Sequence, residues 1–447
     1  MDWKELLCSQ RFGQEDREPG NWQEIRTEFQ RDFDRLIFSA PFRRLQNKTQ
    51  VFPLPGRVFV HNRLTHSLEV ASVGRSIGNL VSRQLTGNMD KEEALLVSEI
   101  GSVVAAACLA HDLGNPPFGH SGENAISRFF SEGNGIRFKE VVSKAEWEDL
   151  ICFEGNANLL RLLTHTFNGR RPGGFAMTYA SLAATIKYPF SSMDKGRKNK
   201  YGYFQSEAQA FEQIISKTGL HRLNNNLSTQ GVCVRHPLVY LVEAADDICY
   251  QIMDMEDASK LNILSVNTVH DIYYRFFQNE ADRSRLERLE KNFTVVRDAN
   301  EQTAYLRAMV INKLVSEVAD GFVSHYQEIM EGTFHGKMID MLQPETAKAM
   351  NYCAEEAFSK VYNHPSVTKV EITGYNVIGF LLEEFTLAFL KPESDYNKKL
   401  LSLMPAQYVE PGTDLYGKLR SVIDFVSGMT DIYAVELYRQ IKGIDLV

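Results

Sequence analysis

The chain has 447 residues, of which 44% are hydrophobic and 24% are charged, a balance typical of a globular protein and not of a disordered one. Its net charge of −8 excludes a protein whose main task is to coat nucleic acid, because that affinity comes from an excess of Lys and Arg. We find no apolar run long enough to cross a bilayer, and residues 1–5 contain no cationic stretch that leads into an apolar one. We therefore expect a cytoplasmic protein that makes no membrane contact.

Apolar residues recur at helical spacing along most of the chain, and strand signals are few. The helices that we predict in chain order cover 66–85, 94–110, 236–254, 303–332, 345–362, 373–391 and 417–441. Near the N-terminus, 51–54 and 57–60 flank a Pro-Gly turn and predict one small β-hairpin. The fold class that follows is all-α, with a helical core, this hairpin and a C-terminal helical extension.

The polar, glycine-rich and basic segments 168–174 and 191–200 lie between central helices, so we interpret them as inserted loops and not as domain linkers. The last connection that we predict is near 391–394. We therefore divide the chain into a large helical core over 1–390 and a C-terminal helical segment over 391–447 that packs on it.

The clearest chemical signal is the segment HDLGNPPFGHSGE at 111–123, directly after the apolar helix 94–110. Adjacent His111 and Asp112 offer one imidazole nitrogen and one carboxylate oxygen to a divalent cation. Gly114 and the two prolines after it turn the chain back, which can present His120 and Glu123 to the same cavity.

Two distant segments supply matching ligands. His66 lies at the start of an amphipathic helix, and the pair Asp246 and Asp247 lies within an apolar one. A carboxylate buried in such a helix costs several kcal/mol unless a cation or hydrogen bonds compensate, so one of the two aspartates is expected to have a function. Asp246 shares a helical face with Tyr250 and Asp254 through i, i+4, i+8 spacing.

The order of His66, His111-Asp112 and a distant aspartate resembles the H…HD…D pattern of HD-domain phosphohydrolases. Within that superfamily the flanking text is similar to the bacterial dGTP triphosphohydrolases, in family order over nearly the whole chain. The blocks that carry the resemblance are FRRLQNKTQVF at 42–52, RLTHSLEV at 63–70, the segment at 111–123, FEGN at 153–156, LAATIKYP at 182–189, EAADDICY at 243–250 and GMTD at 428–431.

The resemblance implies a role for each matching residue. His66, His111, Asp112 and Asp246 would hold one divalent metal ion per subunit, Mn or Mg; the family pattern favours Asp246 over Asp247. His120 and Glu123 would form the catalytic pair. The substrate contacts that it implies are Gln46, Arg63, Asn156, Lys187, Lys200, Tyr250 and Asp254, the last two on the sugar.

The function that the resemblance implies is metal-dependent hydrolysis of dGTP, or of dNTPs more broadly, to the deoxynucleoside and tripolyphosphate, which would control dNTP pools. Family members form homo-oligomers, as tetramers or hexamers; several respond to a dNTP effector and some bind single-stranded nucleic acid. Two alternatives stay open. One is another HD hydrolase, a 5′-nucleotidase or phosphodiesterase, and the other is a non-catalytic HD protein that binds nucleotides or nucleic acid.

Overall fold

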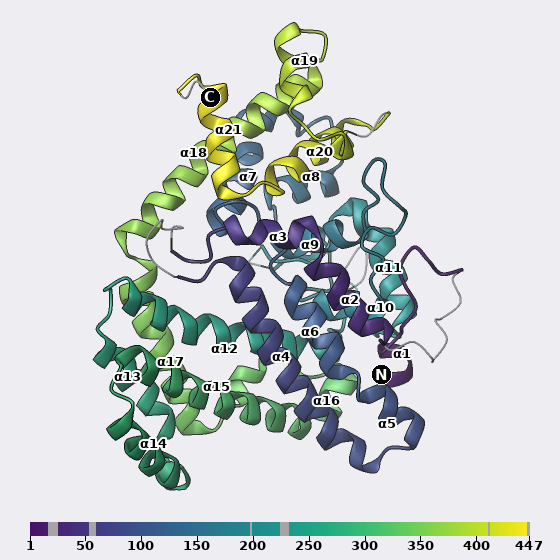
Figure 1. Cartoon of the computed structure of the whole chain (residues 1–447). Helices are drawn as coiled ribbons and strands as arrows, with labels where there is room; N and C mark the ends of the chain where they lie inside the picture. The colour runs from purple at the N-terminus through teal and green to yellow at the C-terminus, as the bar shows by residue number, and fades with distance from the viewer. Residues whose placement is uncertain (17–25, 53–59, 197–198, 224–231, 410–411, 445–447) are drawn as a thin grey trace.

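The computed structural model describes residues 1–16, 26–52, 60–196, 199–223, 232–409 and 412–444, and it is almost entirely helical (Figure 1). The α-helices are α1 (Trp3–Leu6), α2 (Glu28–Ile37), α3 (Ala40–Arg44), α4 (Arg63–Leu85), α5 (Lys91–Val97), α6 (Ile100–Ala110), α7 (His120–Ser131), α8 (Lys144–Ile151), α9 (Gly155–Thr164), α10 (Tyr179–Thr185), α11 (Ala208–Lys217), α12 (Pro237–Lys260), α13 (Val266–Tyr274), α14 (Arg283–Val295), α15 (Ala299–Ser324), α16 (Tyr326–Glu331), α17 (Pro344–Glu356), α18 (Pro365–Leu390), α19 (Asp395–Ser402), α20 (Leu415–Ser427) and α21 (Asp431–Ile441). The short helical turns are η1 (Leu45–Asn47), η2 (Thr86–Asn88), η3 (Asn134–Phe138), η4 (Ser192–Asp194), η5 (Gln205–Glu207), η6 (Arg275–Phe277), η7 (Glu280–Asp282), η8 (Met338–Met341), the π-helical η9 (Ala357–Tyr362) and η10 (Ala406–Tyr408).

The all-α fold class is confirmed, and its centre is the packing of α4, α6 and α12 on one another. Residues 103–110 of α6 are all buried, so this helix has no polar face and lies inside the core. Asn62 begins α4, because its side chain accepts a hydrogen bond from the Thr65 amide in a capping box. Because α4, α6 and α12 pack on one another, the start of α4 and the end of α6 lie beside the middle of α12.

Two of the predicted helices are broken in the structure. The expected helix 94–110 is divided at Ser98–Glu99 into α5 and α6, and the expected helix 417–441 is divided at 428–430 into α20 and α21. Gly428 ends α20 and Thr430 caps α21, which are strong local signals that the apolar periodicity concealed.

The predicted N-terminal hairpin falls mainly on 53–59, outside the described residues. Its flanks are close together, since Thr49 and Asn62 form an isolated antiparallel bridge. A small antiparallel pair that was not predicted joins β1 (Arg222–Leu223) to β2 (Val232–Cys233).

A second hydrophobic cluster lies at the end of the molecule where Figure 1 shows α7, α8 and α20. The long helix α18 reaches from the neighbourhood of α17 to this cluster, where α19, α20 and α21 pack on it. The C-terminal segment after residue 390 therefore rests on α18, while the division of the chain at that residue stays a prediction.

By length and hydropathy alone, Lys91–Ala110 could cross a membrane, which differs from the expectation that no stretch would pass this test. Of its most apolar window, 61% is buried inside the protein, as is usual for a core helix.

Candidate metal centre and active site

Three helices of the core bring the four predicted metal ligands together. His66 lies in the first turn of α4, His111 and Asp112 follow the last turn of α6, and Asp246 lies in the middle of α12. His66 Nε2 lies 3.1 Å from Asp246 Oδ1, His111 Nε2 lies 3.5 Å from the same oxygen, and 3.7 Å separates His111 Nε2 from Asp112 Oδ1. Ligand atoms of His66, His111 and Asp112 all lie within 4.8 Å of one another.

The side chains around this cluster fit a divalent cation. His111 Nδ1 lies 2.6 Å from the Cys108 carbonyl oxygen, an acceptor that keeps the proton on Nδ1 and leaves Nε2 as a ligand. Burial disfavours a charged Asp112, but Arg63, His111 and His66 nevertheless hold its pKa below the ordinary value. Asp112 Oδ2 accepts a hydrogen bond from Arg63 Nη1 at 2.7 Å, and Oδ1 accepts one from Asn115. Two imidazoles and two carboxylates are a donor set suited to Mn or Mg as well as to softer divalent ions.

His120 and Glu123 form a pair at the start of α7. His120 Nδ1 lies 2.8 Å from Glu123 Oε2, and the other carboxylate oxygen accepts a hydrogen bond from the Gly155 amide at 2.7 Å. The hydrogen bond to Glu123 raises the pKa of His120. The Glu123 carboxylate is 8% exposed and the His120 side chain is 82% exposed, so a fixed carboxylate orients an imidazole whose Nε2 remains accessible.

The metal-ligand cluster and the His120–Glu123 pair both adjoin a cavity of about 400 Å³, which the two predicted lysines also line. Lys187 Nζ lies 3.1 Å from Glu243 Oε1, and Lys200 Nζ lies 2.7 Å from Glu154 Oε2. Lys200 Nζ also lies 3.9 Å from Glu123 Oε2. Carboxylates thus hold both ammonium groups, and the lysines can exchange these partners for phosphate oxygens. The predicted site residues that line the cavity are Arg63, His111, Asp112, His120, Glu123, Asn156, Lys187, Lys200, Asp246 and Tyr250.

Tyr250 lines the cavity from α12, where its ring stacks on Tyr362 of η9 with 5.6 Å between centroids. Asp254, one turn further, is buried behind it and accepts a hydrogen bond from the Tyr362 hydroxyl at 2.8 Å. Burial raises the pKa of Asp254 to about 7. Asp254 thus supports the tyrosine pair and does not face the described cavity.

Gln46 lies on η1 with its side chain exposed, outside the described residues that line the cavity. Gln50, four residues later in the same block, lines the cavity, and its buried Oε1 has no hydrogen-bond partner among the described residues. The structure thus brings Gln50 and not Gln46 to the other site residues, and the substrate contact of Gln46 stays a prediction.

Sequence reasoning missed further polar residues that line the cavity, among them Asn115, Glu154 and Glu243. Each lies inside a block that carried the resemblance, so its place near the site could have been expected. Asn115 donates to Asp112 within the same turn, whereas the pairing of Glu154 with Lys200 and of Glu243 with Lys187 joins segments far apart in the chain.

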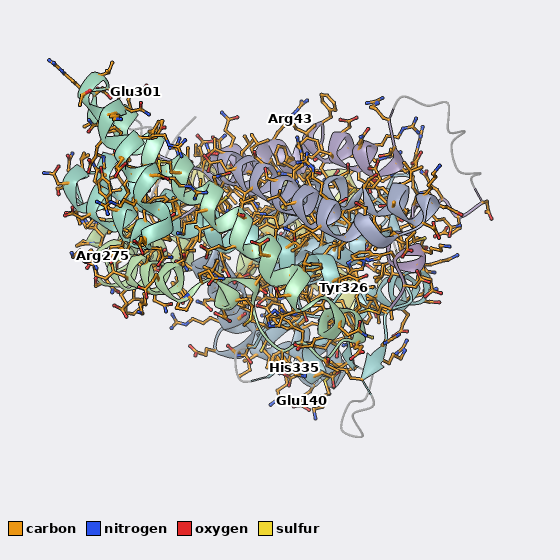
Figure 2. All side chains as sticks on the ribbon, turned by 90° about the horizontal axis from the view of Figure 1, so that it is seen from below. Arg43, Glu140, Arg275, Glu301, Tyr326 and His335 are labelled. Atoms are coloured by element: carbon orange, nitrogen blue, oxygen red, sulfur yellow. The ribbon has the colours of Figure 1, made fainter. Side chains whose placement is uncertain are left out.

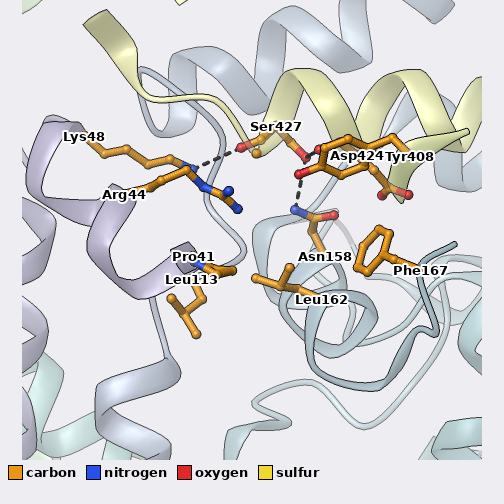
Figure 3. A pocket seen from close by; sticks show the side chains of 11 residues that line it. Pro41, Arg44, Lys48, Leu113, Asn158, Leu162, Phe167, Tyr408, Asp424 and Ser427 are labelled. Atoms are coloured by element: carbon orange, nitrogen blue, oxygen red, sulfur yellow. Dashed lines mark hydrogen bonds between the residues drawn. The ribbon is translucent and has the colours of Figure 1, made fainter. Parts of the chain in front are cut away.

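A junction with the C-terminal segment holds the turn between α6 and α7. Figure 3 shows Lys48 and Asn158 reaching Ser427 at the end of α20. Lys48 Nζ also donates to the Asn115 carbonyl at 2.6 Å, and Asn158 Nδ2 donates to that of Gly114 at 2.8 Å. A Cβ at Gly114 would lie 2.1 Å from a carbonyl oxygen of the neighbouring backbone, so only glycine permits this approach.

Comparisons with known proteins agree with this arrangement. The HD domain model matches residues 63–170, and the model of a phosphohydrolase-associated domain matches residues 341–440. A deoxyguanosinetriphosphate triphosphohydrolase-like protein of Synechocystis sp. is 36% identical, with 100% of both chains covered, and one of Pseudomonas aeruginosa is 36% identical over 99% of both. The deoxyguanosinetriphosphate triphosphohydrolase of Salmonella arizonae is 31% identical, over 94% of this chain and 95% of its own.

The match includes the segment that carries His66, His111 and Asp112, and HD domains bind divalent metals. The relatives are covered over nearly their full length, so the likeness extends to the C-terminal segment as well as to the metal cluster. The chain is thus a phosphohydrolase, and it belongs to the bacterial HD-domain dGTP triphosphohydrolase family.

Proposed function

We propose that the protein hydrolyses dGTP, and other dNTPs to a degree set by the base, to the deoxynucleoside and inorganic tripolyphosphate. The observation that carries the proposal is one cavity lined by His111, Asp112 and Asp246, by the His120–Glu123 pair and by two lysines, with His66 next to the first three. The names of the relatives support dGTP as the substrate.

The charges give the substrate a direction in the cavity. Lys187 and Lys200, which line the cavity, suit the β- and γ-phosphates, whereas Gln50 and Tyr250 suit the sugar and base. The α-phosphate then lies between them, beside Arg63 and the metal ligands. Tyr250 would crowd a 2′-hydroxyl, which favours deoxyribose.

The residues of this chain account for the chemistry of the step. His66, His111, Asp112 and Asp246 would hold one Mn or Mg ion, which supplies electrophilic activation of the phosphoryl group when it is bound. A water oxygen bonds to the α-phosphorus while the bond from phosphorus to the 5′-oxygen breaks, and the proton that the water loses replaces the one that His120 gives up. His120 Nε2 delivers a proton to the departing 5′-oxygen, and Glu123 stabilises the imidazolium through Nδ1.

The products test the proposal. The protein is incubated with each dNTP and Mn or Mg, with and without a second dNTP, and the phosphates are separated by anion exchange. We expect deoxynucleoside and tripolyphosphate in equal amounts from the unmodified protein. His120→Ala should lower kcat by at least about 10²-fold, whereas His270→Ala on α13 serves as a matched control and should leave it unchanged. Pyrophosphate and a monophosphate, or orthophosphate released from dGMP, would instead indicate a different HD hydrolase.

The cytoplasmic location, the homo-oligomeric state, a dNTP effector and binding of single-stranded nucleic acid stay predictions. The arm with a second dNTP addresses the effector, since activation by a nucleotide that is not itself consumed requires a separate site.

A further inference from the structure

A second cavity, of about 720 Å³, adjoins the active-site cavity. Tyr188, Lys200 and Glu243 line both cavities and form the wall between them. The second cavity is also lined by Arg235, just before α12, and by the segment between α16 and η8. Figure 2 shows His335, which belongs to that segment, at the molecular surface seen from below.

Three cations surround one buried carboxylate at the shared wall. Glu243 is 5% exposed; its Oε1 lies 3.1 Å from Lys187 Nζ, which belongs to the active-site cavity, and its Oε2 lies 3.1 Å from Arg235 Nη1, which lines the second cavity. Lys337 Nζ lies 3.9 Å from Glu243 and 3.0 Å from Asp247. Two carboxylates thus share three cations at the wall between the cavities, and Asp340 also lines the second cavity.

The two cations of the second cavity are accessible. The side chains of Arg235 and Lys337 are 25% and 45% exposed, whereas the Glu243 carboxylate is 4% exposed. An entering anion can reach the cations without first removing Glu243 from its buried position. Arg235 also lies over the Tyr240 ring, which holds the guanidinium in place while its partner changes.

The direction of the substrate, which rests on the proposed function, points the phosphate chain at this wall. Lys200 lines both cavities, and Lys187 contacts Glu243 of the wall between them. After the 5′-oxygen departs, the tripolyphosphate lies with its distal phosphates next to Arg235 and Lys337.

We infer that the second cavity is a binding site for a linear triphosphate chain, through which Arg235 and Lys337 draw inorganic tripolyphosphate out of the active site. Each of the two cations exchanges a carboxylate partner for phosphate oxygens as the product moves. Glu243 stays paired with Lys187, so the side of the shared wall that faces the active site regains the contacts that it has without product. The same two residues touch the γ-phosphate of the substrate before the reaction, which links substrate affinity to product release.

The test uses inorganic tripolyphosphate and the variant R235Q/K337Q, which removes two charges but keeps polar side chains. Calorimetric binding of tripolyphosphate should weaken about tenfold, and its inhibition constant against dGTP hydrolysis should rise by the same factor. Inhibition by dGMP should not change, because dGMP carries only the phosphate that lies beside the metal ligands. The single variant K337R, which keeps the positive charge and leaves Arg235 in place, should bind tripolyphosphate nearly as tightly as the unmodified protein.

The control is K348Q/K398Q, which removes two positive charges from exposed ion pairs on α17 and α19. Unchanged tripolyphosphate binding in R235Q/K337Q, or equal weakening in the control or for dGMP, would overturn the inference while leaving the proposed hydrolysis intact. An unmodified protein that binds tripolyphosphate through these residues but releases none from any dNTP would overturn the proposed function alone.

Discussion

The Asp431 carboxylate accepts a hydrogen bond from the Phe118 amide at 3.0 Å, although 313 residues separate them in the chain. Its other oxygen accepts one from the Thr49 amide at 2.8 Å. Phe118 has a φ of 62°, in the left-handed region that costs a residue other than glycine about 1–3 kcal/mol. Two residues later His120 begins α7, so an acid at the start of α21 stabilises the strained turn that presents the imidazole.

Asp431→Asn should therefore act on catalysis through position. An amide has one acceptor oxygen where the carboxylate has two, so one of the two backbone amides loses its partner and the turn relaxes. We expect kcat to fall about 10- to 100-fold. KM and the amount of bound metal should change little, because Asp431 is neither among the described residues that line the cavity nor among the metal ligands. Steady-state kinetics and metal analysis of the same preparation measure this split.

Asp395→Asn is the matched control for that variant, because Asp395 is likewise the first residue of a helix but is exposed on α19. A kcat for Asp431→Asn equal to that of the unmodified protein, or an equal loss in both variants, would refute the positioning role.

Substitution of the two adjacent aspartates of α12, Asp246 and Asp247, should affect metal affinity very differently. Asp246 Oδ1 faces His66 and His111, whereas Asp247 pairs with Lys337. Asp246→Asn should lower metal affinity and turnover at least about hundredfold, and Asp247→Asn should retain the metal. Chelation should abolish turnover of the unmodified protein, and Mn should restore it. Retention of a full complement of metal by Asp246→Asn, measured by elemental analysis, would contradict the ligand assignment.

The sequence was sufficient to predict the helical fold and the convergence of His66, His111 and Asp246. Apolar periodicity identifies helices that must bury a face, whereas the resemblance to the family implies that the ligands on these helices meet. The helix breaks at Ser98 and Gly428 were missed because apolar residues continue across them at helical spacing. Periodicity reports which face is buried and says little about where a helix ends.

The site could be predicted by segment more readily than by residue. Gln46 and Gln50 belong to one block, and only the turn after η1 decides which of them points inward. The role of Asp431 was equally hidden, because it depends on backbone amides of Thr49 and Phe118 that carry no sequence signal.

Two alanine variants test whether Gln46 or Gln50 contacts the substrate. Gln50→Ala should raise KM for dGTP about tenfold, since Gln50 offers a buried Oε1, without a partner in the described part of the chain, to a substrate hydroxyl. Gln46→Ala should leave KM unchanged, because its side chain is exposed on η1. Comparison of dGTP with its 3′-deoxy analogue in both variants checks which hydroxyl is read. If Gln46→Ala gave the larger change, the assignment to Gln50 would fail.

His61 should make the stability of the protein depend on pH. Its imidazole lies between two carboxylates, with Nδ1 at 2.8 Å from Asp257 and Nε2 at 3.0 Å from Glu69. Burial opposes the charge, but the Asp257 and Glu69 carboxylates raise the pKa of His61 to about 10. A folded-state pKa above the unfolded value of about 6.5 means that the stabilisation is complete below that pH, declines above it and is lost as the pH rises through about 10. Urea unfolding of His61→Gln should therefore show a loss of roughly 3 kcal/mol near pH 6 that shrinks steadily toward pH 9.5. His221→Gln, at an exposed position before β1, should show no such trend. A loss for His61→Gln that stayed constant across this range would mean that packing, and not the charged imidazole, links α4 to α12.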